Sequence, residues 1–332
     1  MPVLRWGVLG VANIAVRVVI PAIQRAPGNQ PVAIASRTRA RAQEAAGQLG
    51  IPRAHGSYEA LVDDPDVQAV YIPLPNSLHR EWTMRCARAG KHVLCEKPLA
   101  LTAADGEQMI ATCIRHGVVL MEAFMYRFHP RTQRVAQLVA EGVIGDPRLV
   151  RASFSFAIRG TENIRLQPSL GGGALYDVGC YGVNVSRMIL GEPLEAFAFG
   201  HIGPSGVDEL LGAVLRFGGD RLALVDCSLR LPRREEYEIV GTDGRISVPG
   251  AFLPGTGDTE IHLTRGTERT VKERIVVTIP GVDEYRAMVE HFVGAVAAGA
   301  PLSFPPQDAV ANLRAIEALL RSLRTGRGEP VK

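Results

Sequence analysis

Apolar residues in the first third of the chain form short runs that alternate with longer amphipathic segments. The short runs have the length of buried strands, and the segments between them have the period of helices. Thr102 followed by Asp105 resembles a capping box, and Gly90 stands where a helix commonly ends on a glycine. We expect strands at residues 5–9, 32–35, 69–72, 93–95 and 118–121, with helices at 14–25, 38–50, 77–89 and 102–116.

Strands and helices that alternate at this spacing predict a parallel sheet covered by helices on both faces. This is the α/β arrangement of a doubly wound, Rossmann-type nucleotide-binding domain, and we place it at residues 1–122.

The pattern changes from residue 147 onward, where strand-like segments follow one another with few helices between them. Residues 241–244, Gly-Thr-Asp-Gly, are typical of a hairpin turn. We therefore expect a second, α+β domain at residues 123–332, built on an open, mostly antiparallel sheet. Its expected strands are 149–156, 196–200, 212–217, 222–229 and 237–240, and its expected helices are 177–190, 285–298 and 308–323. The exposed face of such a sheet is expected to be buried against another copy of the chain, so we expect a homodimer or homotetramer.

Length and composition agree with two globular domains. The chain has 332 residues, 46% hydrophobic and 21% charged, with a formal net charge of only +3. Its arginines are scattered apart from Arg37, Arg39, Arg41 and a basic tail, so we expect no nucleic-acid partner. No apolar run reaches the roughly 18 residues of a membrane span, so we expect no membrane partner either. The five cysteines form no C-x-x-C pair, which predicts no metal site and favours a reducing cytoplasm.

The turn after the first strand is the first candidate for a cofactor site. A dinucleotide fingerprint has glycine at the tight turn and small residues where the backbone meets the pyrophosphate. Here Gly10 is followed by Ala12 and Ala15 in place of the second and third glycines. An ordinary strand–helix turn is the alternative, but the position at the start of a βαβ unit favours a cofactor turn that includes Asn13 and Ile14.

The end of the second strand indicates which dinucleotide is bound. Enzymes that use NAD usually carry an acid there for the ribose 2′-hydroxyl. This chain has Ser36 and Arg37 instead, and an arginine with a hydroxyl suits a 2′-phosphate. We predict NADP as the cofactor; the alternative is that Arg37 is simply a solvated residue.

Candidates for proton transfer lie in two segments. Lys97, in the order Cys95-Glu96-Lys97-Pro98, follows a strand at the carboxyl edge where such sheets bind ligands, and its proline is a candidate for a cis bond. Asp177 and Tyr181 are four apart on an expected helix after a glycine-rich stretch. Oxidation of an alcohol needs a base, and a nearby ammonium favours the tyrosine anion. The plain alternatives are a core tyrosine and an acid at a helix start.

The order of these motifs resembles the glucose–fructose oxidoreductase and inositol dehydrogenase (Gfo/Idh/MocA) family over nearly the whole chain. Many members carry histidine at the position of Tyr181. Tyrosine there is similar to the branch of glucose–fructose oxidoreductase, dimeric dihydrodiol dehydrogenase and NADP-linked xylose dehydrogenase. Residues 69–75 and 121–125 also look like those of nucleotide-sugar 3-ketoreductases.

The resemblance implies a role for each candidate residue. Lys97 and Tyr181 would carry proton transfer, with Asp177 assisting. Residues expected to line the cofactor after the later strands are Pro73, Leu74, Asn76, His79, Glu96 and Lys97. Candidates for the substrate pocket, with Asp177 and Tyr181, are Tyr126, Arg127, Phe128 and Arg165. A capping or surface role for His79 is equally open, and for Phe128, four residues after Phe124, a core role is favoured.

These observations together predict an NADP-dependent dehydrogenase that moves a hydride to or from an aldose or related pyranose. Reduction of a keto-sugar, including a nucleotide-linked one, and oxidation of a dihydrodiol are enzymatic alternatives. A non-catalytic NADP sensor is an alternative of another class, and the joint presence of Lys97, Asp177 and Tyr181 argues against it.

Overall fold

The computed structural model describes residues 3–160, 162–266 and 271–332. They form two compact units, one of Met1–Met125 with Asp283–Val310 and the other of Tyr126–Val282 with Ala311–Lys332. The first unit thus differs from the predicted domain of residues 1–122, because it includes a segment from late in the chain. That segment carries helix α8 (Glu284–Ala298), whose Phe292 packs against Trp6 of the first strand with ring centroids 5.1 Å apart.

The first unit is built on a six-stranded parallel sheet with the order β3-β2-β1-β4-β5-β6. The strand order reverses between β1 and β4, and sheets of this kind bind ligands at such a point, outside the carboxyl ends of the strands. The short strand β3 was not predicted, since three residues give no readable alternation. The strands are β1 (Leu4–Leu9), β2 (Asn29–Ala35), β3 (Arg53–His55), β4 (Ala69–Ile72), β5 (His92–Glu96) and β6 (Leu120–Ala123).

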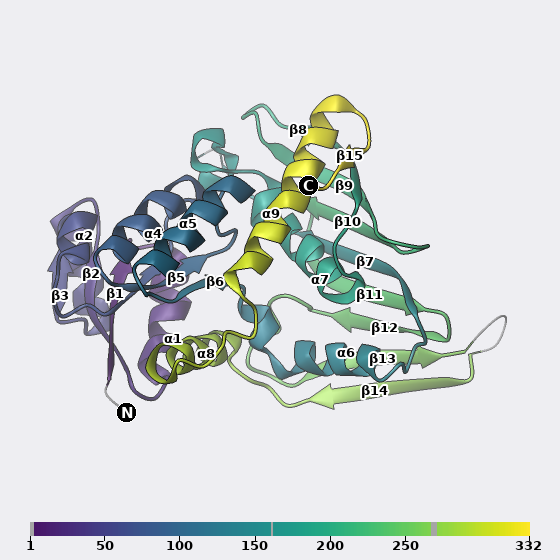
Figure 1. Ribbon diagram of the computed structural model, residues 1–332, viewed down its shortest axis with the longest axis horizontal. Helices are drawn as coiled ribbons and strands as arrows, with labels where there is room; N and C mark the ends of the chain where they lie inside the picture. Colours follow the sequence, from purple (N-terminus) through teal and green to yellow (C-terminus); the bar gives the residue numbers. More distant parts are fainter. Residues whose placement is uncertain (1–2, 161, 267–270) are drawn as a thin grey trace. The chain divides into compact units, whose positions relative to one another are not determined.

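Helices join these strands as the alternation predicts. Figure 1 shows α1 beside α8 and α4 beside α5 in this unit. The expected helix at 14–25 begins with a π-helical turn, Ala15–Val19, before α1 (Ile20–Arg25). The Thr102 hydroxyl accepts a hydrogen bond from the Asp105 amide at 3.1 Å, which confirms the predicted cap. The other helices are α2 (Arg39–Leu49), α3 (Tyr58–Val62), α4 (His79–Arg88) and α5 (Ala103–Arg115).

The second unit is built on a nine-stranded sheet with the order β14-β13-β12-β11-β7-β10-β9-β8-β15. Among the described strands, β7 and β10 form a parallel pair and the other neighbours are antiparallel, which confirms the expected mostly antiparallel sheet. The predicted hairpin joins β11 to β12. The strands are β7 (Pro147–Ser155), β8 (Glu195–Ile202), β9 (Asp208–Arg216), β10 (Leu222–Ser228), β11 (Arg234–Gly241), β12 (Gly244–Pro249), β13 (Thr259–Arg265), β14 (Glu273–Ile279) and β15 (Glu329–Pro330).

The second unit also contains helices α6 (Pro130–Ala140) and α7 (Cys180–Leu190) and, from Ala311 onward, α9 (Pro306–Thr325). α7 lies close against β7 and β10 because Gly182 has no side chain: a methyl group there would lie 2.6 Å from Val225 and 3.3 Å from Ala152. The Ala198 amide of β8 donates to the Ser322 hydroxyl of α9 at 2.9 Å. The core of the unit lies between these helices and the sheet.

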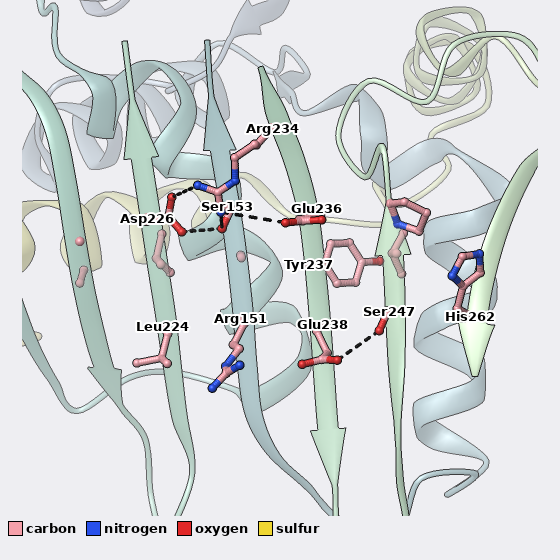
Figure 2. Close-up of a pocket in the computed structure, with 16 residues that line it drawn as sticks. Arg151, Ser153, Leu224, Asp226, Arg234, Glu236, Tyr237, Glu238, Ser247 and His262 are labelled. Atoms are coloured by element: carbon pink, nitrogen blue, oxygen red, sulfur yellow. Dashed lines mark hydrogen bonds and ion pairs between the residues drawn. The ribbon is translucent and has the colours of Figure 1, made fainter. Parts of the chain in front are cut away.

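The opposite face of the sheet is polar at its centre. Figure 2 shows Ser153 and Arg234 converging on Asp226, and Ser247 donating to Glu238 at 3.2 Å. Strand alternation explains this, since every second side chain of β7, β10 and β11 faces the helices and the others face away.

Candidate functional site

Three segments of the first unit meet at the turn after β1. Gly10 has φ of +107°, a backbone conformation that L side chains rarely adopt, and its amide donates to Ala35 at 2.9 Å. A methyl group on Gly10 would lie 3.1 Å from the Leu74 side chain and 3.8 Å from the Tyr58 hydroxyl oxygen. The tight turn therefore brings the loop after β4 and the start of α3 to one place.

The remaining residues of the predicted cofactor turn follow directly. Ala12 accepts a backbone hydrogen bond from Val16 at 3.0 Å, so the chain is already helical there. Asn13 is exposed and Ile14 is half-buried. Helix N-termini of this kind present free backbone amides to a pyrophosphate.

The end of β2 carries a hydroxyl and a group of arginines. Ser36 is buried, and its amide donates to His55 at 3.2 Å, whereas Arg37 is exposed. Burial raises the pKa of Tyr58, and the positive charges of Arg37 and Arg41 oppose that rise. The Tyr58 phenol near Gly10 thus lies within the electrostatic influence of two guanidinium groups.

Tyr58 and Arg41 were not among the predicted cofactor residues. Arg41 donates to the Val11 carbonyl at 3.2 Å and so touches the cofactor turn itself. The cluster Arg37, Arg39 and Arg41 was a visible signal for the arginine. No local pattern marks Tyr58, which reaches Gly10 only through the fold.

The loop after β4 is held from behind by His79. Pro73 and Leu74 are buried and Asn76 is half-exposed, in the 3-10 turn Asn76–Leu78. The His79 ring is 0% exposed, and its Nε2 lies 2.8 Å from the Leu74 carbonyl oxygen. The structure thus places His79 behind the loop, where the ring offers no surface for direct contact with a dinucleotide.

The turn that carries Lys97 is anchored to its neighbours by carboxylates. Tyr71 of β4 donates to Glu96 Oε1 at 2.5 Å, and the Lys97 amide lies 3.3 Å from Glu96 Oε2. The Leu99 amide donates to Glu122 Oε1 of β6 at 2.8 Å. The Lys97–Pro98 peptide bond is cis, as the sequence suggested. Glu96 thus binds the protein's own groups and fixes the turn at the carboxyl edge of the sheet.

In the second unit, Asp177 and Tyr181 lie on one helical segment. Asp177 is in the π-helical turn Leu175–Gly179, and Tyr181 is in the first turn of α7. Arg165 Nε donates to Asp177 Oδ2 at 2.6 Å, and the Arg165 guanidinium lies over Phe156 at 5.6 Å. Two predicted site residues are therefore brought together as an ion pair.

Tyr181 packs within an aromatic cluster. It is 4% exposed, and its ring centroid lies 5.7 Å from Tyr126, 5.3 Å from Phe154 and 5.1 Å from Phe252. The Tyr126 hydroxyl donates to Asn184 Oδ1 at 2.6 Å. Tyr126, predicted for the substrate pocket, is thus a buried neighbour that supports Tyr181. Arg127 and Phe128 are also buried.

A carboxylate that the sequence did not reveal holds the start of this helical segment. Asp208 Oδ2 accepts from the Leu175 amide at 2.7 Å, next to Gly173 with φ of +120°. Burial raises the pKa of Asp208 from 3.8 to about 6, while backbone amides, including that of Leu175, oppose the rise. Asp208 fixes the backbone from which Asp177 and Tyr181 project.

Within the described ranges, no three histidine, cysteine, aspartate or glutamate side chains are placed to hold a metal ion. No helix of the described chain is both long and apolar enough to cross a membrane.

The chain matches known proteins along its whole length. A family model described as an oxidoreductase family with an NAD-binding Rossmann fold matches residues 4–124, and the GFO/IDH/MocA C-terminal domain matches residues 132–247. A D-xylose 1-dehydrogenase (NADP(+)) from Haloferax volcanii is 42% identical over 324 residues, 97% of this chain and 98% of that protein. The chain belongs to the Gfo/Idh/MocA family of oxidoreductases.

Other relatives of this Gfo/Idh/MocA protein carry different names. A trans-1,2-dihydrobenzene-1,2-diol dehydrogenase from Xenopus tropicalis is 36% identical over 269 residues, 80% of each chain. The solved structure of a 3-ketoreductase from Actinomadura kijaniata, in complex with NADP and TDP-benzene, superimposes with a TM-score of 0.90. It is 33% identical and covers 97% of this chain and 98% of that one. The predicted family, fold class and oxidoreductase activity are confirmed, whereas the roles of individual site residues stay predictions.

Proposed function

We propose that this oxidoreductase uses NADP. Ser36 and Arg37 end β2 without an acidic neighbour, and Tyr58 and Arg41 add a phenol and a second guanidinium beside the Gly10 turn. A carboxylate at this place would repel a 2′-phosphate, and these groups would bind it. The Haloferax dehydrogenase is named for NADP(+), and the Actinomadura reductase was solved with NADP, which supports the same choice.

The proposed reaction is oxidation of an aldose or related pyranose at an alcohol carbon. Bound NADP would accept the hydride. Tyr181 would take the hydroxyl proton, and the Lys97 ammonium would favour the tyrosine anion. Asp177, oriented by Arg165 at 2.6 Å, would bind a substrate hydroxyl. The observation that carries this proposal is the tyrosine held in an aromatic cluster one helical turn from an oriented carboxylate.

Reduction of a keto-sugar, including a nucleotide-linked one, is the second candidate. The TM-score of 0.90 to a 3-ketoreductase favours it. The same residues would act in reverse, with Tyr181 giving its proton to the carbonyl oxygen as the hydride arrives.

A homodimer or homotetramer formed through the open sheet face of the second unit is part of the proposal. That face combines the charged centre of Figure 2 with exposed apolar side chains at one side, where Phe199 is 64% exposed. Its mixture of arginines and acids is complementary to a second copy of itself. The proposed location is the cytoplasm, on the basis of five cysteines that are all free and buried.

The first test is an absorbance assay at 340 nm of purified protein with NADP or NAD and a panel of aldoses, cyclitols and dihydrodiols. We expect one aldose to reduce NADP. If no compound of the panel changes the absorbance while NADP still binds, the result would instead favour the keto-sugar reductase or the sensor.

The second test separates catalysis from structure. Tyr181→Phe should lower turnover by about 100-fold or more and leave NADP affinity unchanged. The matched control is Tyr237→Phe, because Tyr237 also contacts Phe252 and its buried hydroxyl has no partner among the described residues. Equal turnover in the two variants would contradict the role of Tyr181.

A further inference from the structure

One buried side chain joins the two loops that carry the proposed cofactor and proton-transfer groups of the first unit. His79 Nε2 lies 2.8 Å from the Leu74 carbonyl oxygen, and its Nδ1 lies 2.9 Å from the Pro98 carbonyl oxygen. Leu74 belongs to the loop after β4, and Pro98 is next to Lys97. The imidazole is 0% exposed, so water does not compete for either contact.

Both partners of the ring are acceptors, which makes this contact unusual for a buried histidine. A neutral imidazole donates from one nitrogen only, whereas an imidazolium donates from both. Burial and the Lys97 charge lower the pKa of His79, and the carbonyls of Pro98, Leu74 and Leu99 oppose that decrease. In either protonation state, the buried ring fills the space between the two carbonyl oxygens, so neither carbonyl can move toward the other without displacing the ring.

The contacts continue from His79 to the cofactor turn. The Leu74 side chain lies 3.1 Å from the position that a Cβ atom on Gly10 would take, so the loop that His79 contacts packs closely against the Gly10 turn. Glu96 and Glu122 attach the Lys97 turn to β4 and β6. His79 thus connects the Gly10 turn, through Leu74, with Pro98 and Lys97.

We propose that His79 is a positioning residue that couples the cofactor loop at Leu74 to the placement of the Lys97 ammonium. This inference rests on the proposed function, in which Lys97 supports proton transfer. His79 would contact neither NADP nor substrate.

The experiment compares His79→Leu and His79→Gln with His92→Leu. His92 is the matched control, because it begins the same strand β5 that ends before Lys97 and accepts from the Val119 amide at 3.0 Å. A misplacement of about 1 Å at a reacting group costs roughly 100-fold in rate. We therefore expect His79→Leu to lower kcat by about 100-fold and to raise the Kd of NADP, measured by calorimetry, by less than about 5-fold.

Two further measurements decide whether His79 acts by positioning Lys97: the activity of a conservative His79 variant, and the effect of His79→Leu when Lys97 is absent. His79→Gln keeps N–H donors and should recover part of the lost kcat. In a Lys97→Ala background, His79→Leu should lower kcat by no more than about 2-fold further, because the two residues act through one group. The histidine NMR signal of His79, but not that of His92, should shift when NADP is added.

The outcomes separate the two proposals. A folded His79→Leu protein with wild-type kcat, or the same kcat loss in His92→Leu, would overturn the role of His79. Full additivity with Lys97→Ala would overturn it as well. If Lys97→Ala itself keeps wild-type activity, the proposed function fails, and the NADP-induced NMR shift still tests the link from His79 to the cofactor loop.

Discussion

The two units fix their functional groups in different ways. In the first unit, Gly10, Leu74 and Lys97 lie in loops at strand ends, and His79 and two carboxylates hold these loops through backbone atoms. In the second unit, Tyr181 lies on a helix that packs directly on a sheet at Gly182. The loop site depends on several separate anchors, whereas the helix site depends on the close contact between one helix and the sheet. We therefore expect changes at the end of β2 in the first unit to alter cofactor selectivity, and changes in the backbone contacts that hold the Tyr181 helix to alter stability.

The largest effect should come from Arg37 in the loop-built site. Arg37→Asp removes a charge-assisted partner of the 2′-phosphate and adds a repelling carboxylate, so the preference for NADP over NAD should fall by roughly 100-fold or more. The ratio of kcat/KM for the two cofactors measures it. Arg39→Asp, with the same charge change in α2, is the control. An equal fall in NADP preference in both variants would show that the effect comes from the net charge of the region and not from a contact made by Arg37.

The next effect concerns Asp208 in the helix-built site. Because its pKa is raised from 3.8 to about 6, the folded state holds this proton more tightly than the unfolded state. Its contribution to stability is therefore complete below pH 4 and decreases as pH rises toward 6, by about 3 kcal/mol at most. Asp208→Asn cannot titrate, so its denaturation midpoint relative to wild type should rise between pH 4 and 6.5. Parallel pH profiles of the two proteins would contradict this assignment.

Two glycines test the comparison, because the same Gly→Ala substitution should change the free energy of unfolding in opposite directions in the two units. Gly182→Ala places a methyl group 2.6 Å from Val225 and should destabilise the protein by about 1–3 kcal/mol. Gly294 of α8 has nothing within 4 Å of such a methyl group, so Gly294→Ala should stabilise by about 0.5–1 kcal/mol. Thermal denaturation measures both, and a shift of the same sign would refute the close helix–sheet contact at Gly182.

The smallest effect is expected for Tyr58. Tyr58→Phe removes one hydroxyl beside the arginines and should weaken NADP binding by about 1 kcal/mol, or roughly 5-fold, with little change for NAD. Fluorescence titration with each cofactor measures it. An equal loss for both cofactors would assign Tyr58 to the shared pyrophosphate instead of the 2′-phosphate.

The parts of this molecule that the sequence predicts are those encoded by neighbours in the chain. Strand–helix alternation, the Thr102 cap, the hairpin at residues 241–244 and the cis bond before Pro98 each follow from a few adjacent residues. The place of Lys97 after a strand and the spacing of four between Asp177 and Tyr181 made these residues candidates, and the family resemblance implied a role for each.

What the sequence did not predict depends on residues brought together by folding. Tyr58 reaches Gly10, and Asp208 reaches Leu175, only after a sheet has formed. Burial of His79 could not be inferred either, because a polar ring near the start of the expected helix at 77–89 suggested a capping or surface position. The expected strands did not include β3, β12, β13, β14 or β15, and helix α8 was predicted but assigned to the other domain.

The placement of α8 has a consequence for how the protein is made. Trp6 begins the first unit, and its partner Phe292 is translated only after almost all of the second unit. Domains generally fold as units during synthesis, starting from the N-terminus. The first unit departs from this order, because its sheet leaves the ribosome before residues 283–310 have been translated. Until then, Trp6 lacks its contact with Phe292. A nascent chain arrested before residue 283 should therefore bind chaperones through that surface, and one arrested after the whole of α8 has left the exit tunnel should not.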